Sequence, residues 1–95
     1  MNRLLRAIQD AVRQGRVEIA DHALERFLER DVDIEETIEG VQQATLLEDY
    51  SVTRQEPRIL VAQRESSGRV IHVVWEAPTD TTPDAVIVTV IRPQR

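Results

Sequence analysis

Two histidines and four arginines are the residues of this chain whose types and spacing suit chemistry on a phosphodiester. His22 opens a predicted helix, and Arg26 and Arg30 follow it at intervals of four residues. Residues four apart lie on one face of a helix, so these three side chains form a polar stripe. Because an imidazole moves protons near neutral pH and a guanidinium matches phosphate oxygens, the stripe predicts binding or cleavage of a phosphodiester.

The same stripe also has a purely structural interpretation. Glu25 and Glu29 lie at helical spacing from the arginines, so ion pairs on a solvated face explain these residues as well. In that interpretation His22 donates a hydrogen bond to nearby backbone and simply fixes the helix.

His72, Arg69 and Arg92 form the second group of candidates. His72 lies within an apolar strand, where it is either a packed residue or the reserve catalytic partner of His22. Arg69 and Arg92 lie at predicted strand ends, where they either contact phosphate or pair with Glu76 and the acidic helices.

The first half of the chain predicts helices, because its apolar residues recur at helical spacing. Gly15 is placed to end the first helix, and Asp33 is placed to cap the third. A short extended link, residues 16–19, joins the first helix to the second. The predicted helices span about residues 2–14, 22–30 and 34–43.

The second helix is the central element of the prediction, because it carries the polar stripe. Asp21 is its predicted N-cap, since a carboxylate accepts hydrogen bonds from the free amides of the first turn. Leu24, Phe27 and Leu28 are predicted to lie opposite the stripe and to be buried.

From Thr45 onward the hydrophobic period becomes alternating, which predicts strands over residues 45–52, 58–64, 69–76 and 85–92. Residues 66–68 predict a tight hairpin and residues 77–84 a longer one. The result is an α+β domain with N-terminal helices on one face of a four-stranded antiparallel sheet. The alternation predicts which residues face which side. Ile71, Val73 and Trp75 face the helices, while His72 lies on the opposite face, and Arg92 shares the parity of Val86, Val88 and Val90.

Composition limits the function classes. The 95 residues predict one domain, 1–95, with 41% hydrophobic and 31% charged residues and a net charge of −5. This acidity argues against broad electrostatic binding of nucleic acid, so any RNA contact is local. The absence of cysteine, of a signal-like apolar run and of a membrane-length segment favours a cytoplasmic protein. Neither a metal site nor a nucleotide cofactor is predicted, because no ligand spacing or glycine-rich turn is present.

Seven short motifs along nearly the whole chain resemble the family of domains of unknown function numbered 4258. They are Gln14-Gly15-Arg16, Ile19-Ala20-Asp21-His22-Ala23, Glu29-Arg30, Leu47-Glu48-Asp49-Tyr50, Gly68-Arg69, His72-Val73-Val74-Trp75 and Val88-Thr89-Val90-Ile91-Arg92-Pro93. The family usually has serine at Ala20, glycine at Asp31 and tyrosine at Ile91.

The resemblance implies a RelE-like fold and the toxin component of a bacterial toxin–antitoxin pair. It implies a metal-independent endoribonuclease in which His22 and His72 are catalytic and Arg26, Arg30, Arg69 and Arg92 bind RNA phosphate. The implied partner is an antitoxin, of the YgiT zinc-finger type, that covers the arginines and the sheet face near His72. The alternative is a non-catalytic protein-interaction domain with a degenerate RelE-like fold, which the acidic charge and Ile91 both favour.

Overall fold

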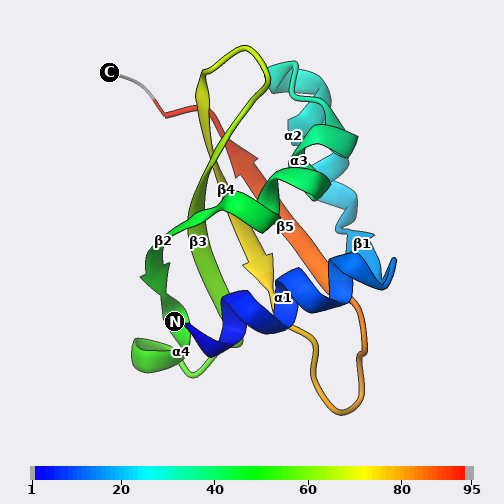
Figure 1. Cartoon of the computed structure of the whole chain (residues 1–95), viewed down its shortest axis with the longest axis vertical. Helices are drawn as coiled ribbons and strands as arrows, with labels where there is room; N and C mark the ends of the chain where they lie inside the picture. Colours follow the sequence, from blue (N-terminus) through cyan, green and yellow to red (C-terminus); the bar gives the residue numbers. More distant parts are fainter. Residues whose placement is uncertain (1, 94–95) are drawn as a thin grey trace.

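The computed structural model describes residues 2–93, in which helices precede most of a five-stranded sheet (Figure 1). In Figure 1, α1 and α3 cross in front of the strands. The α+β class is therefore confirmed. The elements in chain order are α1 (Arg3–Arg13), β1 (Val17–Ile19), α2 (Asp21–Arg30), α3 (Ile34–Gly40), the 3₁₀ turn η1 (Val41–Gln43), β2 (Thr45–Asp49), α4 (Tyr50–Thr53), β3 (Arg58–Arg64), β4 (Val70–Glu76) and β5 (Ala85–Ile91).

Helix α1 follows its predicted boundaries. The Asn2 side chain caps its start, and Gly15 adopts a φ of 76° just beyond its end. This left-handed conformation lets the Arg16 amide reach back to the Ala11 carbonyl at 2.8 Å, which satisfies a terminal acceptor of the helix. The inner stripe of the helix is buried and consists of Leu5, Ile8 and Ala11.

Helix α2 begins one residue earlier than predicted. Ala20 is its N-cap and makes no side-chain capping bond, so the prediction of Asp21 as N-cap is wrong. Asp21 is instead the first helical residue, where its carboxylate still lies beside the positive end of the helix dipole. At its other end, α2 stops at Asp31, which adopts a φ of 53°.

The buried face of α2 also differs from the prediction. Ala23 and Phe27 are buried, whereas Leu24 and Leu28 remain 42% and 84% exposed. Phe27 lies one turn after Ala23, and the small Ala23 lets the helix approach β5 closely. The two leucines lie a quarter turn away and point outward.

The predicted third helix is confirmed at its start and interrupted at its end. The Asp33 carboxylate accepts from the Glu36 amide at 2.9 Å, as an N-cap does. The Glu36 carboxylate accepts from the Ser66 amide and hydroxyl at 3.0 and 3.1 Å, so it ties α3 to the β3–β4 hairpin. After Gly40 the chain tightens into η1.

The sheet has five strands in the order β1-β5-β4-β3-β2, so the prediction of four antiparallel strands is wrong. The difference is β1, predicted as a link, which pairs parallel to β5 with Ile19 opposite Ile87. Its three residues are too few to show an alternating pattern. Strand β2 is also shorter than predicted. Asp49 caps helix α4, and Tyr50 is the first residue of that helix, so the strand ends at Asp49.

The core lies between the helices and one face of the sheet. Its predicted centre, Ile71, Val73 and Trp75, is confirmed, because each is at most 1% exposed. The Trp75 indole donates to the Gln63 side-chain oxygen at 2.9 Å, and the Gln63 amide donates to the Thr37 carbonyl at 2.8 Å. Each of these buried polar groups therefore has a partner.

A β-bulge in β5, opposite Val74, changes which residues face the helices. Val88 and Thr89 both remain half-exposed, and Val90 is fully buried. Because one extra residue shifts the alternation, the predicted parity of Val90 and Arg92 is wrong. Both point to the helix side of the sheet.

Candidate functional site

The two histidines lie on different surfaces. His22 is exposed in the first turn of α2, within the helical layer. His72 lies between buried neighbours on β4 and therefore faces the other side of the sheet, where it pairs with Ala62 and Ile91. The structure does not bring the two imidazoles together, so His72 is not placed to assist His22.

Arg26 and Arg30 share the accessible side of α2 with His22, but both contact a carboxylate. Their guanidinium groups lie 3.0 and 3.4 Å from Glu29 Oε1, with 39% and 34% of their side chains exposed. Exposed pairs of this kind contribute little to stability and exchange readily. The geometry matches the solvated-face interpretation, and the phosphate-binding role of these arginines stays a prediction.

Arg92 forms a clamp between α2 and the β3–β4 hairpin. Its Nη1 and Nη2 atoms donate to Glu65 Oε1 and Oε2 at 2.7 and 3.1 Å. Its Nε and Nη2 atoms donate to the carbonyls of Arg30 and Asp31 at 2.8 and 3.0 Å. The hydrogen bonds with Glu65 raise the pKa of Arg92 further. Four donated bonds occupy this guanidinium, which favours a structural role as a C-terminal cap of α2.

Arg69 lies beside the same clamp. Its Nε is 3.9 Å from Glu65 Oε1, and 68% of its side chain is exposed. The predicted phosphate ligands therefore lie beside two different carboxylates, Arg26 and Arg30 beside Glu29, and Arg69 and Arg92 beside Glu65.

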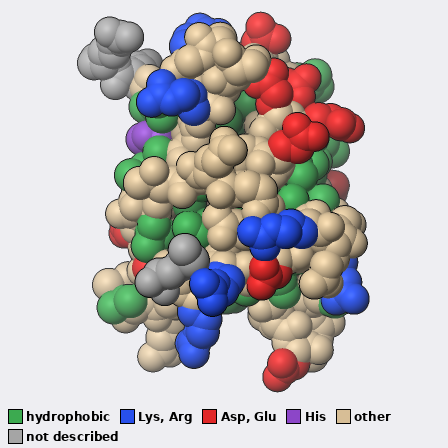
Figure 2. Space-filling model, viewed as in Figure 1, with side chains coloured by type: hydrophobic (Ala, Val, Ile, Leu, Met, Phe, Trp, Pro, Cys, Tyr) green, Lys and Arg blue, Asp and Glu red, His purple; other side chains and the backbone are tan. Residues whose placement is uncertain are grey.

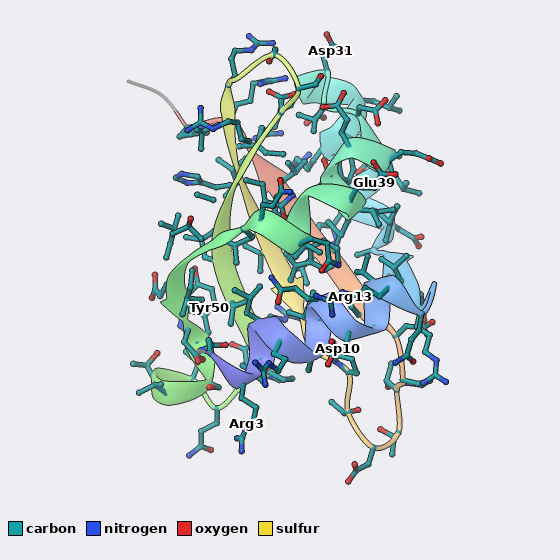
Figure 3. All side chains as sticks on the ribbon, viewed as in Figure 1. Arg3, Asp10, Arg13, Asp31, Glu39 and Tyr50 are labelled. Carbon is teal, nitrogen blue, oxygen red and sulfur yellow. The ribbon has the colours of Figure 1, made fainter. Side chains whose placement is uncertain are left out.

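Several arginines outside the predicted set are more open to an anion, among them two on α1. Arg3 and Arg6 are exposed on α1, and no carboxylate of residues 2–93 lies within ion-pair distance of either side chain. Figure 3 shows Arg3 pointing away from the sheet at the start of this helix. Their spacing of three on the outer face of an amphipathic helix is a signal present in the sequence.

The sheet surface opposite the helices, here called the open face, is apolar at its centre and carries the Arg58–Glu76 ion pair at one end. Its side chains alternate with the buried core residues and remain partly exposed, with Val70 and Ile91 each at 38%. His72 lies among them. The apolar members are Leu60, Ala62, Val70, Val74, Val86, Val88 and Ile91. Their signal in the sequence is the run of apolar residues at both parities of β4 and β5, which is typical of a strand buried on both faces.

Residues 2–93 contain no group of three or more histidine, aspartate or glutamate side chains placed to hold a metal ion. Across the same residues, no helix has the length and apolar character needed to cross a membrane.

Comparison with known families places the chain. Residues 19–92 match the family described as "Domain of unknown function (DUF4258)", and the chain belongs to this family. No curated protein and no solved structure matches the chain. The match covers both histidines, the Arg92–Glu65 clamp and the open face.

Proposed function

We propose that this chain is a protein-interaction domain with a degenerate RelE-like fold, and that the open face binds the partner. The observation that carries the proposal is the contrast between the two sides of one sheet. Helices seal one side, whereas the apolar side chains around His72 remain partly exposed on the other. Apolar surface left exposed in this way is typical of an interaction site.

The shape of the open face favours a protein partner. The three central strands have seven residues each, which gives a surface about 23 Å long and about 15 Å wide. Small-molecule sites are concave and usually exceed about 300 Å³, whereas the hollow beside Ala62 and Val70 at this face has a volume of only about 110 Å³. The RelE-like resemblance suggests an antitoxin as the partner, of the YgiT zinc-finger type.

Endoribonuclease activity is the second candidate function. It is favoured by His22, which is exposed one turn before the partly exposed Arg26. In that mechanism His22 activates the ribose 2′-hydroxyl or protonates the leaving 5′-oxygen, and Arg26 and Arg30 hold the phosphate. The separation of His22 from His72 and the net charge of −5 make this candidate the weaker one.

Co-expression with the product of the adjacent gene tests the interaction. We expect a complex that co-purifies and that Val74→Glu on the open face disrupts, because a buried unpaired charge is strongly unfavourable. Val52→Glu is the matched control, since Val52 lies on α4 and is 80% exposed. A complex that survives Val74→Glu as well as Val52→Glu contradicts the proposed surface.

Incubation of the purified chain with RNA tests the second candidate. Cleavage by the wild-type chain that is lost in His22→Ala would establish the endoribonuclease, and loss in His72→Ala as well would show a role for both histidines. Growth arrest on induction of wild type, absent for His22→Ala, would give the same answer in cells. Complex formation without cleavage or growth arrest is the result that the interaction proposal predicts.

A further inference from the structure

An apolar groove lies between the end of α2 and the start of α3, on the helical side of the molecule. Phe27, Leu28, Val32 and Ile34 line it, and its volume is about 330 Å³. Leu28 is 84% exposed, and Leu24, one turn earlier on the same face of α2, is 42% exposed. Contiguous apolar surface of this kind is typical of a docking site when charged residues surround it.

The rim of the groove is acidic. Asp31, Asp33 and Glu35 line it beside the apolar side chains. Residues 21–40 contain eight acidic residues and two arginines, a net charge of −6, whereas the whole chain carries −5. Figure 2 shows acidic side chains gathered over the α2–α3 side at the upper right, and Figure 3 places Asp31 and Glu39 there. The negative charge of the protein is therefore concentrated in the segment that forms this groove.

We propose that the groove docks an arginine- or lysine-rich segment of a partner protein, with an apolar anchor over Leu28 and Ile34 and cations beside Asp31 and Glu35. Charge complementarity selects this occupant, because a basic segment is attracted here while a nucleic acid or an anionic membrane is repelled. The groove's size suits a few side chains of one segment. The site is separate from the open face, so it does not rest on the function proposed above.

Asp31 lines the groove and also adopts an unusual backbone conformation. Its φ of 53° lies in the left-handed region, which glycine adopts without strain and other residues adopt at a cost. Asp31→Gly should therefore raise the melting temperature while it removes a carboxylate from the rim. If Asp31→Gly weakens binding of the basic segment while it raises the melting temperature, general unfolding is excluded as the cause of the weaker binding.

Selection of a random peptide library displayed on phage against the folded, full-length chain tests the proposal. We expect the enriched peptides to contain an excess of arginine and lysine together with a large apolar residue. The most enriched peptide, labelled for fluorescence anisotropy, is then the probe for all variants.

Two matched pairs of variants locate the binding site. Leu28→Glu should weaken binding of the probe by about tenfold or more. Val52→Glu, at a site 80% exposed, should leave the affinity for the probe unchanged. Asp31→Asn with Glu35→Gln should weaken it by about tenfold, and the equally neutralising pair Glu48→Gln with Asp80→Asn should not. Asp31→Gly should weaken binding and raise the melting temperature.

Three results would overturn the proposal. The first is the absence of enrichment, or enrichment of peptides without excess basic residues. The second is equal loss of affinity in each variant and its matched control. The third is concentration-dependent dimerisation of the chain that Leu28→Glu abolishes, which would assign the groove to a second copy.

Discussion

The two faces of the sheet consist of the same strands and of similar residues, yet only one is core. On β4, Ile71, Val73 and Trp75 are at most 1% exposed, whereas Val70 on the other side is 38% exposed. Valine and isoleucine are plentiful on both faces, so composition does not distinguish them. The two faces differ instead in coverage, because the helices lie over only one of them. The comparison separates residues that hold the fold together from neighbouring residues that are available to a partner.

The largest expected effect is a loss of stability, caused by a substitution at the centre of the helix-covered side of the sheet, here called the sealed face. Trp75 is fully buried and donates a hydrogen bond to Gln63. Trp75→Ala should lower the free energy of unfolding by about 3–5 kcal/mol, because it leaves both a cavity and an unpaired amide oxygen. Chemical denaturation measures this loss. A loss below about 1 kcal/mol would mean that this face is not the principal core.

A smaller loss is expected where the sealed face meets the end of α2. Arg92→Ala removes a bidentate pair with Glu65 and two bonds to helix-terminal carbonyls, so the melting temperature should fall clearly. Arg69→Ala is the matched control, because its side chain is 68% exposed and only approaches Glu65. Equal melting temperatures for the two variants would contradict the clamp.

Sequence alone predicted the helical half, the three hairpin strands and the core centred on Trp75, because these depend on local periodicity. It did not predict β1, since its three residues gain their strand conformation from pairing with β5. It assigned Leu24 and Leu28 to the core, because hydrophobicity does not show which stripe of α2 the sheet contacts. It also assigned Arg92 to the wrong face, because the bulge at Val88 is a tertiary feature.

The separation of the histidines, in contrast, could be predicted from the sequence. Helical spacing placed His22 on a helix, and the alternation along β4 placed His72 on the sheet face opposite the helices. The acidic character of residues 21–40 could have been found from the charge distribution, because that segment alone carries a more negative net charge than the whole chain.

A loss of about 1 kcal/mol is expected at the edge of the sealed face for Asp49→Ala. The Asp49 carboxylate accepts from the Ser51 hydroxyl, the Asn2 amide and the Ser51 backbone amide, and these hydrogen bonds lower its pKa from the ordinary 3.8. A lowered folded-state pKa gives stability that is present above the unfolded-state pKa and is lost as pH falls through the folded-state pKa.

Denaturation of wild type and Asp49→Ala across acidic pH measures this contribution. The difference between the two proteins should be constant near neutral pH and should shrink as pH falls below 3.8. If the difference in unfolding free energy between wild type and Asp49→Ala stays the same down to the acid transition, the charge of the Asp49 carboxylate is not the source of the stabilisation.

Val73 and Val74 are adjacent on β4 and face opposite sides of the sheet. Variants at these two positions therefore test whether one face is core and the other binds the partner. Stability and affinity for the adjacent-gene partner are measured for each alanine variant by denaturation and calorimetry. Val73→Ala should cost about 2 kcal/mol of stability with an unchanged Kd, and Val74→Ala should cost less than about 1 kcal/mol while raising the Kd about tenfold. If Val74→Ala leaves the Kd of that complex unchanged, the open face is not the binding surface.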